Sequence, residues 1–272
     1  MQKNVMHRPP AVAGRFYPAH PETLKRDLES YIERVTPLQA ALGCVVPHAG
    51  LMYSGHVAGA VYGRLQLPAS YILLCPNHTG HGRPLAIMSE GEWETPLGAV
   101  SIDAPLAQAL KQACPQLEED DQAHRSEHSL EVQLPFLQYL QGTFRFVPIA
   151  LGVDSYEPLQ ELGRAIARVL ADHPARPLIV ASSDLNHYEP DQVNRIKDRK
   201  AIDRILALDA RGLFDTVQQQ RISMCGYGPA TAMLTAVCEL GARTAELVRY
   251  ANSGDVTGDR SAVVGYAGLI IR

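Results

Sequence analysis

The sequence lacks the features that mark several common classes of protein. No stretch approaches the roughly 20 apolar residues of a membrane-spanning helix, and residues 1–10 contain no apolar signal-peptide core. There is no Lys- or Arg-rich run, and the formal net charge of -4 argues against a nucleic-acid or anionic-membrane surface. The five cysteines have no disulfide spacing, and several lie inside apolar runs. We therefore expect a cytoplasmic protein with reduced thiols and with neither a nucleic-acid nor a membrane partner.

Familiar cofactor motifs are absent as well. The chain has no Gly-x-Gly-x-x-Gly after a strand, no phosphate loop with Gly-Lys-Ser/Thr and no Cys-x-x-Cys pair. Residues 254–260 contain acidic side chains without the spacing of a calcium loop. A functional site must therefore be sought among residues that folding brings together.

The 272 residues have an ordinary globular composition, with 46% hydrophobic and 20% charged residues. No repeat, low-complexity linker or change in composition divides the chain, so we expect one domain that spans residues 1–272. Predicted strands alternate with predicted helices. That alternation indicates an α/β fold whose central sheet, largely parallel or mixed, is flanked by helices.

The predicted elements follow from apolar periodicity. Trp93 lies in a predicted loop between two strands, and Pro135 should kink a helix over residues 129–140 or lie near its start. The remaining predicted helices cover residues 24–35, 55–65, 104–113, 157–171, 191–208 and 229–240, and the predicted strands cover residues 42–46, 71–75, 84–88, 99–102, 144–151, 177–181, 244–251 and 262–271.

Three of the predicted strands end where metal-competent or acid–base side chains appear. His48 follows the first of these apolar runs, His78 follows the second, and Asp184 and His187 follow the third. In open α/β sheets, ligands bind beyond the carboxyl ends of the parallel strands. We therefore expect these side chains to meet at one edge of the sheet and to form an active site.

Each candidate residue has a second interpretation. His48 and His78 are metal ligands or hydrogen-bonded structural histidines. Cys225 precedes a predicted helix whose N-terminus would lower the thiol pKa, which favours a nucleophile or a metal ligand over a small buried apolar residue. Asp184 and His187 suit general acid/base chemistry, although Asp184 could instead cap a turn.

The segment Glu127-His128-Ser129-Leu130-Glu131 is ambiguous. Its two carboxylates and its imidazole could lie in the first turn of a helix, where the dipole favours negative charge. The alternative is a solvated start of a helix. The spacing is not that of the His-Glu-x-x-His zinc motif.

Seven segments, in this order along nearly the whole chain, resemble the Memo family, whose prokaryotic members are known as the Memo-like component of a radical-SAM-associated system. They are Ala11-Val12-Ala13-Gly14-Arg15-Phe16-Tyr17-Pro18, Pro47-His48-Ala49-Gly50, Pro76-Asn77-His78, Glu127-His128-Ser129-Leu130-Glu131, Ser182-Ser183-Asp184-Leu185-Asn186-His187, Cys225-Gly226 and Tyr250-Ala251-Asn252-Ser253. Each segment is weak alone, but the ordered set is specific.

The resemblance implies a fold similar to that of class III extradiol dioxygenases, with a metal crevice at one end of the sheet. It implies His48, His78 and Cys225 as metal ligands, and it places Asp184 and His187 in the same crevice. Those dioxygenases hold Fe(II) with two histidines and a carboxylate, whereas a cysteine stands here. Because thiolate shifts the preference towards copper or zinc, ring cleavage is not carried over with the fold.

We therefore expect a mononuclear non-haem metal enzyme, with Fe(II) as its metal, that carries out redox chemistry on an unknown small substrate. His187 would act as the general acid/base, with Asp184 or His128 orienting it or the substrate. A protein of the radical-SAM system is the macromolecular partner that the resemblance suggests. The alternatives are a non-catalytic copper- or iron-binding or protein-interaction module and a zinc hydrolase.

Overall fold

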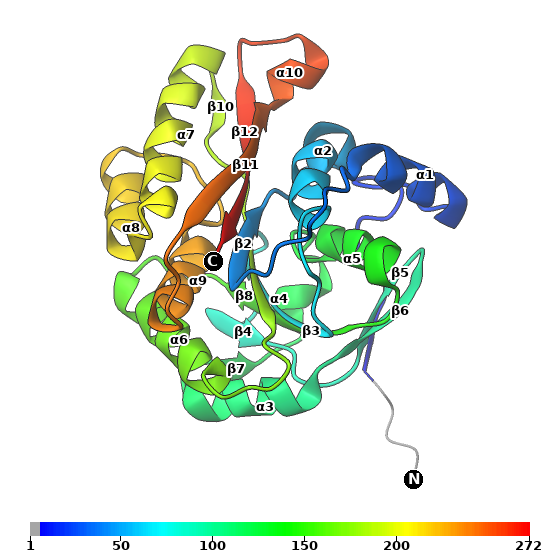
Figure 1. Cartoon of the computed structure of the whole chain (residues 1–272), viewed down its shortest axis with the longest axis vertical. Helices are drawn as coiled ribbons and strands as arrows, with labels where there is room; N and C mark the ends of the chain where they lie inside the picture. The colour runs from blue at the N-terminus through cyan, green and yellow to red at the C-terminus, as the bar shows by residue number, and fades with distance from the viewer. Residues whose placement is uncertain (1–5) are drawn as a thin grey trace.

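Within residues 6–272, a mixed twelve-stranded sheet runs through the centre of the molecule, and helices pack on its two faces (Figure 1). The computed structural model describes residues 6–272, so residues 1–5 of the predicted domain lie outside the described residues. The predicted α/β class and the mixed sheet are confirmed.

The centre of the sheet is parallel. It consists of β8 (Arg145–Leu151), β3 (Ser70–Pro76), β9 (Leu178–Ser182) and β2 (Gly43–Val46), in that order. β12 (Val263–Ile271) then pairs antiparallel with β2. The other strands lie outside this centre: β1 (His7–Arg8), β4 (Leu85–Ile87), β5 (Glu92–Thr95), β6 (Gly98–Ile102), β7 (Glu118–Glu119), β10 (His187–Glu189) and β11 (Ala245–Asn252).

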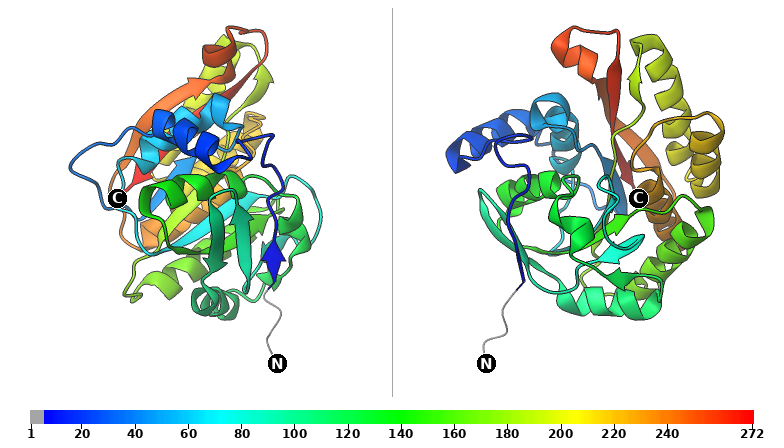
Figure 2. Two further views of the ribbon diagram at one scale, coloured as in Figure 1. Left: turned by 90° about the vertical axis from the view of Figure 1, so that its right-hand side faces the viewer. Right: turned by 180° about the vertical axis from the view of Figure 1, so that it is seen from behind.

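Alternate side chains of the central strands point to opposite faces of the sheet, and they pack into two separate hydrophobic clusters, one on each face. On one face lie α1 (Pro21–Tyr31), α2 (Leu51–Tyr62) and α5 (Leu134–Gln141). The other face is covered by α3 (Ala104–Ala113), α6 (Tyr156–Leu170), α7 (Asp191–Leu206), α8 (Ala210–Gln219) and α9 (Tyr227–Glu239). Figure 2 shows the N-terminal segment along the sheet edge beside β5, with which β1 pairs.

The shorter helices are α4 (Gln122–Arg125), the 3-10 turn η1 (Glu131–Gln133) and α10 (Ser253–Thr257). Pro135 stands in the first turn of α5, directly after η1, which agrees with its predicted place near the start of a helix. No helix within residues 6–272 is long and apolar enough to cross a membrane.

Some predicted boundaries were wrong. The helix predicted over residues 55–65 begins at Leu51, and α8 and β10 were not predicted. Trp93 lies within β5 rather than in a loop, and its fully buried ring lies under the Arg8 guanidinium at 4.0 Å. β5 pairs with β6 in a local antiparallel hairpin, with Trp93 opposite Val100, and the prediction missed this strand.

Candidate metal centre

The carboxyl ends of three adjacent parallel strands open into one cavity. His48 follows β2, His78 follows β3 and Asp184 follows β9, and all three line a cavity of about 680 Å³. Cys225, His128 and His187 line the same cavity, so folding brings together all six residues that the sequence singled out. The wall is completed by Phe16, Ala49, Gly50, Tyr53, Tyr188, Ser223, Val264 and Tyr266.

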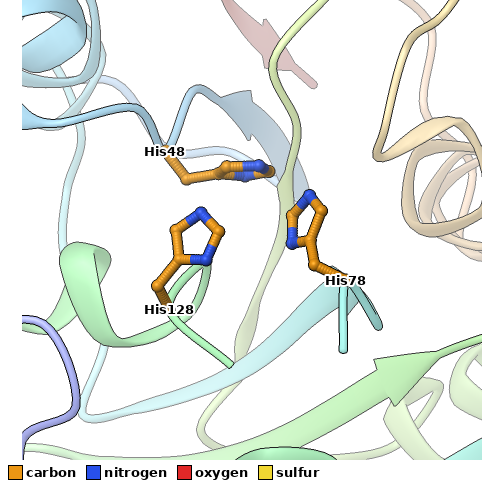
Figure 3. Close-up of side chains that lie close together, drawn as sticks. All are labelled: His48, His78 and His128. Atoms are coloured by element: carbon orange, nitrogen blue, oxygen red, sulfur yellow. The ribbon is translucent and has the colours of Figure 1, made fainter. Parts of the chain in front are cut away.

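Three imidazoles form the tightest group of metal-competent side chains. One ligand nitrogen from each of His48, His78 and His128 lies within 4.8 Å of the others, and Figure 3 shows the three rings around a common space. The ring centroids of His48 and His78 are 5.1 Å apart, and those of His78 and His128 are 4.8 Å apart. His128, expected as a catalytic residue, is thus also placed as a possible ligand.

The hydrogen bonds of Ser182 determine which nitrogen of His48 carries the proton. Ser182 Oγ lies 2.9 Å from His48 Nδ1 and donates its single proton to the carbonyl oxygen of Ser129 at 2.7 Å. Towards His48 the hydroxyl can therefore act only as an acceptor, so Nδ1 is protonated. Nε2 is then unprotonated and carries the lone pair that a metal ion would bind, and in this structure it faces the Cys225 thiol at 3.2 Å.

Glu127 gives His78 the same tautomer. Its fully buried carboxylate accepts from His78 Nδ1 at 2.9 Å and from the His78 backbone N–H at 2.6 Å. The Ser129 hydroxyl and backbone N–H also donate to it. His128 Nδ1 lies 3.5 Å from the same carboxylate oxygen. A carboxylate behind the imidazole is the usual support of a metal-binding histidine.

The electrostatics favour neutral imidazoles at His48 and His128. Burial, with the neighbouring histidines, holds the pKa of His48 well below its ordinary value, and burial likewise lowers the pKa of His128. Burial also opposes the charged form of His78, but the hydrogen bond to Glu127 outweighs it and raises the pKa of His78. Because a metal ion binds neutral imidazole, His78 is the ligand for which protons compete most strongly.

Cys225 lies beside His48 just before α9. Its Sγ is 3.2 Å from His48 Nε2 and 3.6 Å from the carbonyl oxygen of Asp184. Burial and the Asp184 carboxyl raise the thiol pKa, so the lowering expected from the helix N-terminus was wrong. Two ligands of one tetrahedral ion lie roughly 3.5 Å apart, so Cys225 could ligate together with His48. Its assignment as a ligand stays a prediction.

Asp184 both caps a turn and faces the cavity. Its Oδ1 accepts from the backbone N–H of His48 at 2.7 Å and from that of Ala49 at 3.3 Å. Burial raises the pKa of Asp184 to about 6, although the two N–H groups oppose the shift. The side chain therefore fixes the turn that carries His48, and it can also exchange a proton near neutral pH.

His187 lines the cavity from the start of β10. Its Nδ1 lies 2.8 Å from the carbonyl oxygen of Ser223, which can only accept, so Nδ1 carries the proton and Nε2 is free. Asp184 or His128 was expected to orient His187 or the substrate, and the hydrogen-bond partner of the His187 ring is Ser223 instead. Neutral His187 can accept a proton at Nε2, as a general base must.

A buried ion pair anchors the arm that brings Phe16 to the cavity. Arg8 Nη1 lies 2.7 Å from the fully buried Glu131, which also accepts from the Tyr17 hydroxyl at 2.5 Å and from the backbone N–H of Val12. Phe16 then packs on His128, with ring centroids 4.5 Å apart. Glu131 is therefore a buried anchor rather than part of a solvated helix start.

Little in the sequence indicated the supporting residues. Ser182 and Ser223 are common types whose roles depend on which neighbour they face, and Glu127 was assigned to the start of a helix. One signal was available for Glu127, because a glutamate next to a candidate histidine often supports metal ligands. No signal identified Ser223, since its role depends on β10.

Comparisons with known proteins agree along almost the entire chain. A family model described as "Memo-like protein" matches residues 8–270. A MEMO1 family protein of Methanopyrus kandleri is 44% identical over 281 residues, which cover 98% of this chain and 99% of that protein. One from Methanosarcina barkeri is 44% identical over 266 residues, covering 97% of this chain and 99% of that protein.

A solved structure has a similar fold at low sequence identity. An uncharacterized protein of Escherichia coli K12 superposes with a TM-score of 0.54 and 13% identity, covering 84% of this chain and 98% of that one. This likeness supports the fold and carries no information on chemistry.

Proposed function

This chain belongs to the Memo family, and from that premise we propose that it is a mononuclear Fe(II) enzyme that oxidises a small uncharged organic substrate. One observation carries the proposal. The ligand nitrogens of His48, His78 and His128 converge within 4.8 Å of one another, and at His48 and His78 hydrogen bonds from Nδ1 leave Nε2 unprotonated. That donor set fits a divalent transition metal ion, since imidazole suits iron, copper and zinc alike.

Two sets of ligands are consistent with this centre. His48 and His78 belong to both sets, and the third ligand is His128 in the set that the grouping favours or Cys225 in the set that the family resemblance implies. Fe(II) would supply redox chemistry with O₂. If Cys225 joins the set, its thiolate would favour copper or zinc.

The cavity suits a small molecule. Its volume of about 680 Å³ lies within the usual range for ligand pockets of roughly 300–1,000 Å³, and Phe16, Tyr53 and Tyr266 form an apolar wall. The lining residues within the described chain include no Lys or Arg, so the protein itself offers no side-chain cation for a phosphate or carboxylate group.

His187 and Asp184, which line the same cavity, would supply the acid–base groups. His187 would accept a proton from a substrate hydroxyl at Nε2, because Nδ1 is already protonated and bonded to Ser223. Asp184 would hold the turn that carries His48 and could take up a proton near pH 6, its pKa being about 6. A protein that only stores metal would not need a base opposite its ligands.

The test begins with protein purified without oxygen. Its metal content is measured, it is reloaded separately with Fe(II), Cu(I) and Zn(II), and O₂ consumption is followed with uncharged aromatic alcohols, including catechols. His187→Ala should lower turnover by about 10²–10⁴-fold and leave metal content intact. His81→Ala is a matched control, since His81 is exposed in the loop that follows His78.

The outcomes separate the ligand sets and the alternatives. Weaker metal binding in His128→Ala but not in Cys225→Ser would support the three-histidine set, and the reverse result would support Cys225. A protein that binds metal but shows no turnover, and whose metal binding is the same in His187→Ala, would favour the non-catalytic module. That result would contradict the proposal of an enzyme. The partner from a radical-SAM system stays a prediction.

Zinc hydrolysis is the second candidate, because three imidazoles with an open position are a ligand set typical of catalytic zinc. It predicts ester hydrolysis by the Zn(II) form without O₂ and no O₂ consumption by the Fe(II) form. That pair of results would replace the oxidative proposal.

A further inference from the structure

A series of hydrogen-bonded polar groups runs from His187 through the exposed Ser223 to the buried Asn186, Asn194 and Asp198. Ser223 holds His187 chiefly through two hydrogen bonds of 2.8 Å: its carbonyl oxygen accepts from Nδ1, and its hydroxyl oxygen accepts from the His187 backbone N–H. A longer contact joins the Ser223 hydroxyl to the His187 carbonyl oxygen at 3.4 Å. The position of Ser223 therefore sets both the backbone and the ring of His187.

Asn186 in turn holds Ser223. Its Oδ1 accepts from the Ser223 backbone N–H at 2.9 Å and from the Ser223 hydroxyl at 3.1 Å. Because a backbone N–H can only donate, the oxygen of the Asn186 amide must face Ser223, and the amide nitrogen must face the other way. That nitrogen donates to Asn194 Oδ1 at 2.9 Å.

Asp198, on α7, is the innermost residue of this hydrogen-bonded series. Its fully buried carboxylate accepts from the Asn186 backbone N–H at 2.8 Å, from Asn194 Nδ2 at 2.8 Å and from the Tyr250 hydroxyl at 2.6 Å. Asp198 and Asn194 are four residues apart, so they lie on one face of the helix and hold Asn186 at two points. Burial of an acidic group is costly, which makes a purely space-filling role a poor explanation.

The backbone of β12 leaves room for this carboxylate. A Cβ at Gly265 would lie 1.9 Å from Asp198 Oδ2, so a residue with a side chain could not stand there without displacing Asp198. Gly265 also bonds the same turn, accepting from the Leu185 N–H at 2.8 Å and donating to the Asn186 carbonyl at 3.0 Å. The glycine and the carboxylate thus fit together around Asn186.

We propose that Asp198 is a positioning residue that acts through Asn186 and Ser223 to hold His187 as the Nδ1–H tautomer, with Nε2 towards the cavity. The inference rests on the proposed role of His187 as the base, but it requires neither a particular metal nor a particular substrate. Asp198 touches neither the cavity nor the metal-binding histidines in this arrangement. Its effect is on the orientation and the tautomer of one imidazole.

The tautomer can be measured without any activity. In full-length protein with ¹⁵N-labelled histidine, loaded with diamagnetic Zn(II), the two ring nitrogens of His187 are identified by their loss in His187→Ala. We expect well-separated shifts in the wild type, with Nδ1 in its protonated range and Nε2 in its unprotonated range. In Asp198→Asn the two shifts should move towards each other as the tautomers interconvert.

Two further variants keep the test decisive. Asp203→Asn removes an exposed carboxylate from the same helix, one that pairs with Arg199, and should leave the His187 shifts unchanged. If Asp198→Asn does not fold, Ser223→Ala is the deciding variant. It removes the hydroxyl that links Asn186 to the His187 backbone. The two ¹⁵N shifts of the His187 ring should then also move towards each other.

Wild-type shifts of an Nε2–H tautomer would overturn the inference, as would unchanged shifts in both Asp198→Asn and Ser223→Ala. A Zn(II) titration of the same samples separates this result from the proposed function. A wild-type protein that binds no metal would contradict the proposed function, whereas the tautomer shifts would still report on Asp198.

Discussion

Glu127 and Asp198 are both fully buried carboxylates behind the cavity, yet their pKa values move in opposite directions. Burial alone would raise the pKa of Glu127, but hydrogen bonds from His78 and Ser129 lower it to about 2. Burial raises the pKa of Asp198 to about 7, and the hydrogen bonds from Tyr250, Asn186 and Asn194 do not offset it.

The difference lies in the partners rather than in the depth of burial. Glu127 accepts a hydrogen bond from an imidazole that can carry positive charge or bind a metal ion, whereas Asp198 accepts only from neutral amides and a phenol and feels the charge of Arg195 without a hydrogen bond to it. A hydrogen-bonded group that can carry positive charge stabilises the Glu127 carboxylate, whereas at Asp198 the neutral donors and the charge of Arg195 together do not offset burial. The candidate ligand His78 is thus supported by Glu127, which stays ionised at neutral pH. His187 is supported through Asp198, whose pKa is about 7.

The largest expected effect comes from removing the histidines themselves. His48→Ala or His78→Ala should weaken Zn(II) binding by more than the about 10–100-fold that loss of a supporting partner costs, because each removes a ligand. Calorimetric titration measures the affinity. His187→Ala is the control, because it removes a histidine that lines the same cavity without being a proposed ligand. It should bind Zn(II) as the wild type does. Equal losses in all three variants would make His187 a ligand.

The opposite pKa shifts predict opposite slopes of stability with pH. Glu127, with its pKa lowered from 4.5 to about 2, contributes stability that is present above pH 4.5 and is lost as the pH falls towards 2. Asp198, with its pKa raised from 3.8 to about 7, favours the folded state most below pH 3.8, and that contribution is lost as the pH rises to 7. Each contribution is on the order of 3 kcal/mol.

Denaturant unfolding of the wild type, Glu127→Gln and Asp198→Asn across both pH ranges measures these slopes. Relative to Glu127→Gln, the wild type should gain stability between about pH 2 and pH 4.5. Relative to Asp198→Asn, it should lose stability between pH 3.8 and about pH 7. Slopes of the same sign would remove the contrast between the two carboxylates.

A smaller effect should follow from loss of the carboxylate behind His78. In the wild type, the two oxygens of Glu127 accept from the backbone N–H and from Nδ1 of His78. In Glu127→Gln only one of these two atoms is an oxygen that can accept, so the Nδ1–H tautomer of His78 loses support. We expect Zn(II) affinity to fall by about 10–100-fold. Asp198→Asn serves as the matched control, and it should leave Zn(II) affinity unchanged. A similar loss in both variants would indicate general destabilisation of the fold.

The smallest effect is the competition between protons and metal at His78. Because the hydrogen bond to Glu127 raises the pKa of His78 above its ordinary value of 6.5, protons should begin to displace a metal ion from this ligand near neutral pH. Affinity should fall by at most about tenfold per pH unit as the pH decreases. In Glu127→Gln this dependence should move to lower pH. An affinity that stays constant between pH 8 and pH 6 would contradict neutral His78 as a ligand.

The sequence predicted the sheet well where apolar runs are long. The runs that form β2, β3 and β9 are short and almost continuously apolar, as expected of parallel strands that are buried on both faces. Parallel strands in one sheet present their carboxyl ends at the same edge. His48, His78 and Asp184 each follow the carboxyl end of one of these strands, and this is enough to predict that they lie together. The family followed from seven ordered segments, and the comparisons confirm it.

The tertiary structure alone decided how these side chains are used. The tautomer of His48 depends on a Ser182 proton that goes to Ser129, the tautomer of His78 depends on Glu127, and that of His187 depends on Ser223. These partners are 36 to 134 residues apart in the chain, and hydrogen bonds are effective only at short range. Sequence periodicity determines which face of an element is buried, but it does not determine which polar neighbour lies there. Local sequence therefore determined the strands and the edge at which they meet, and long-range packing set the positions of the protons.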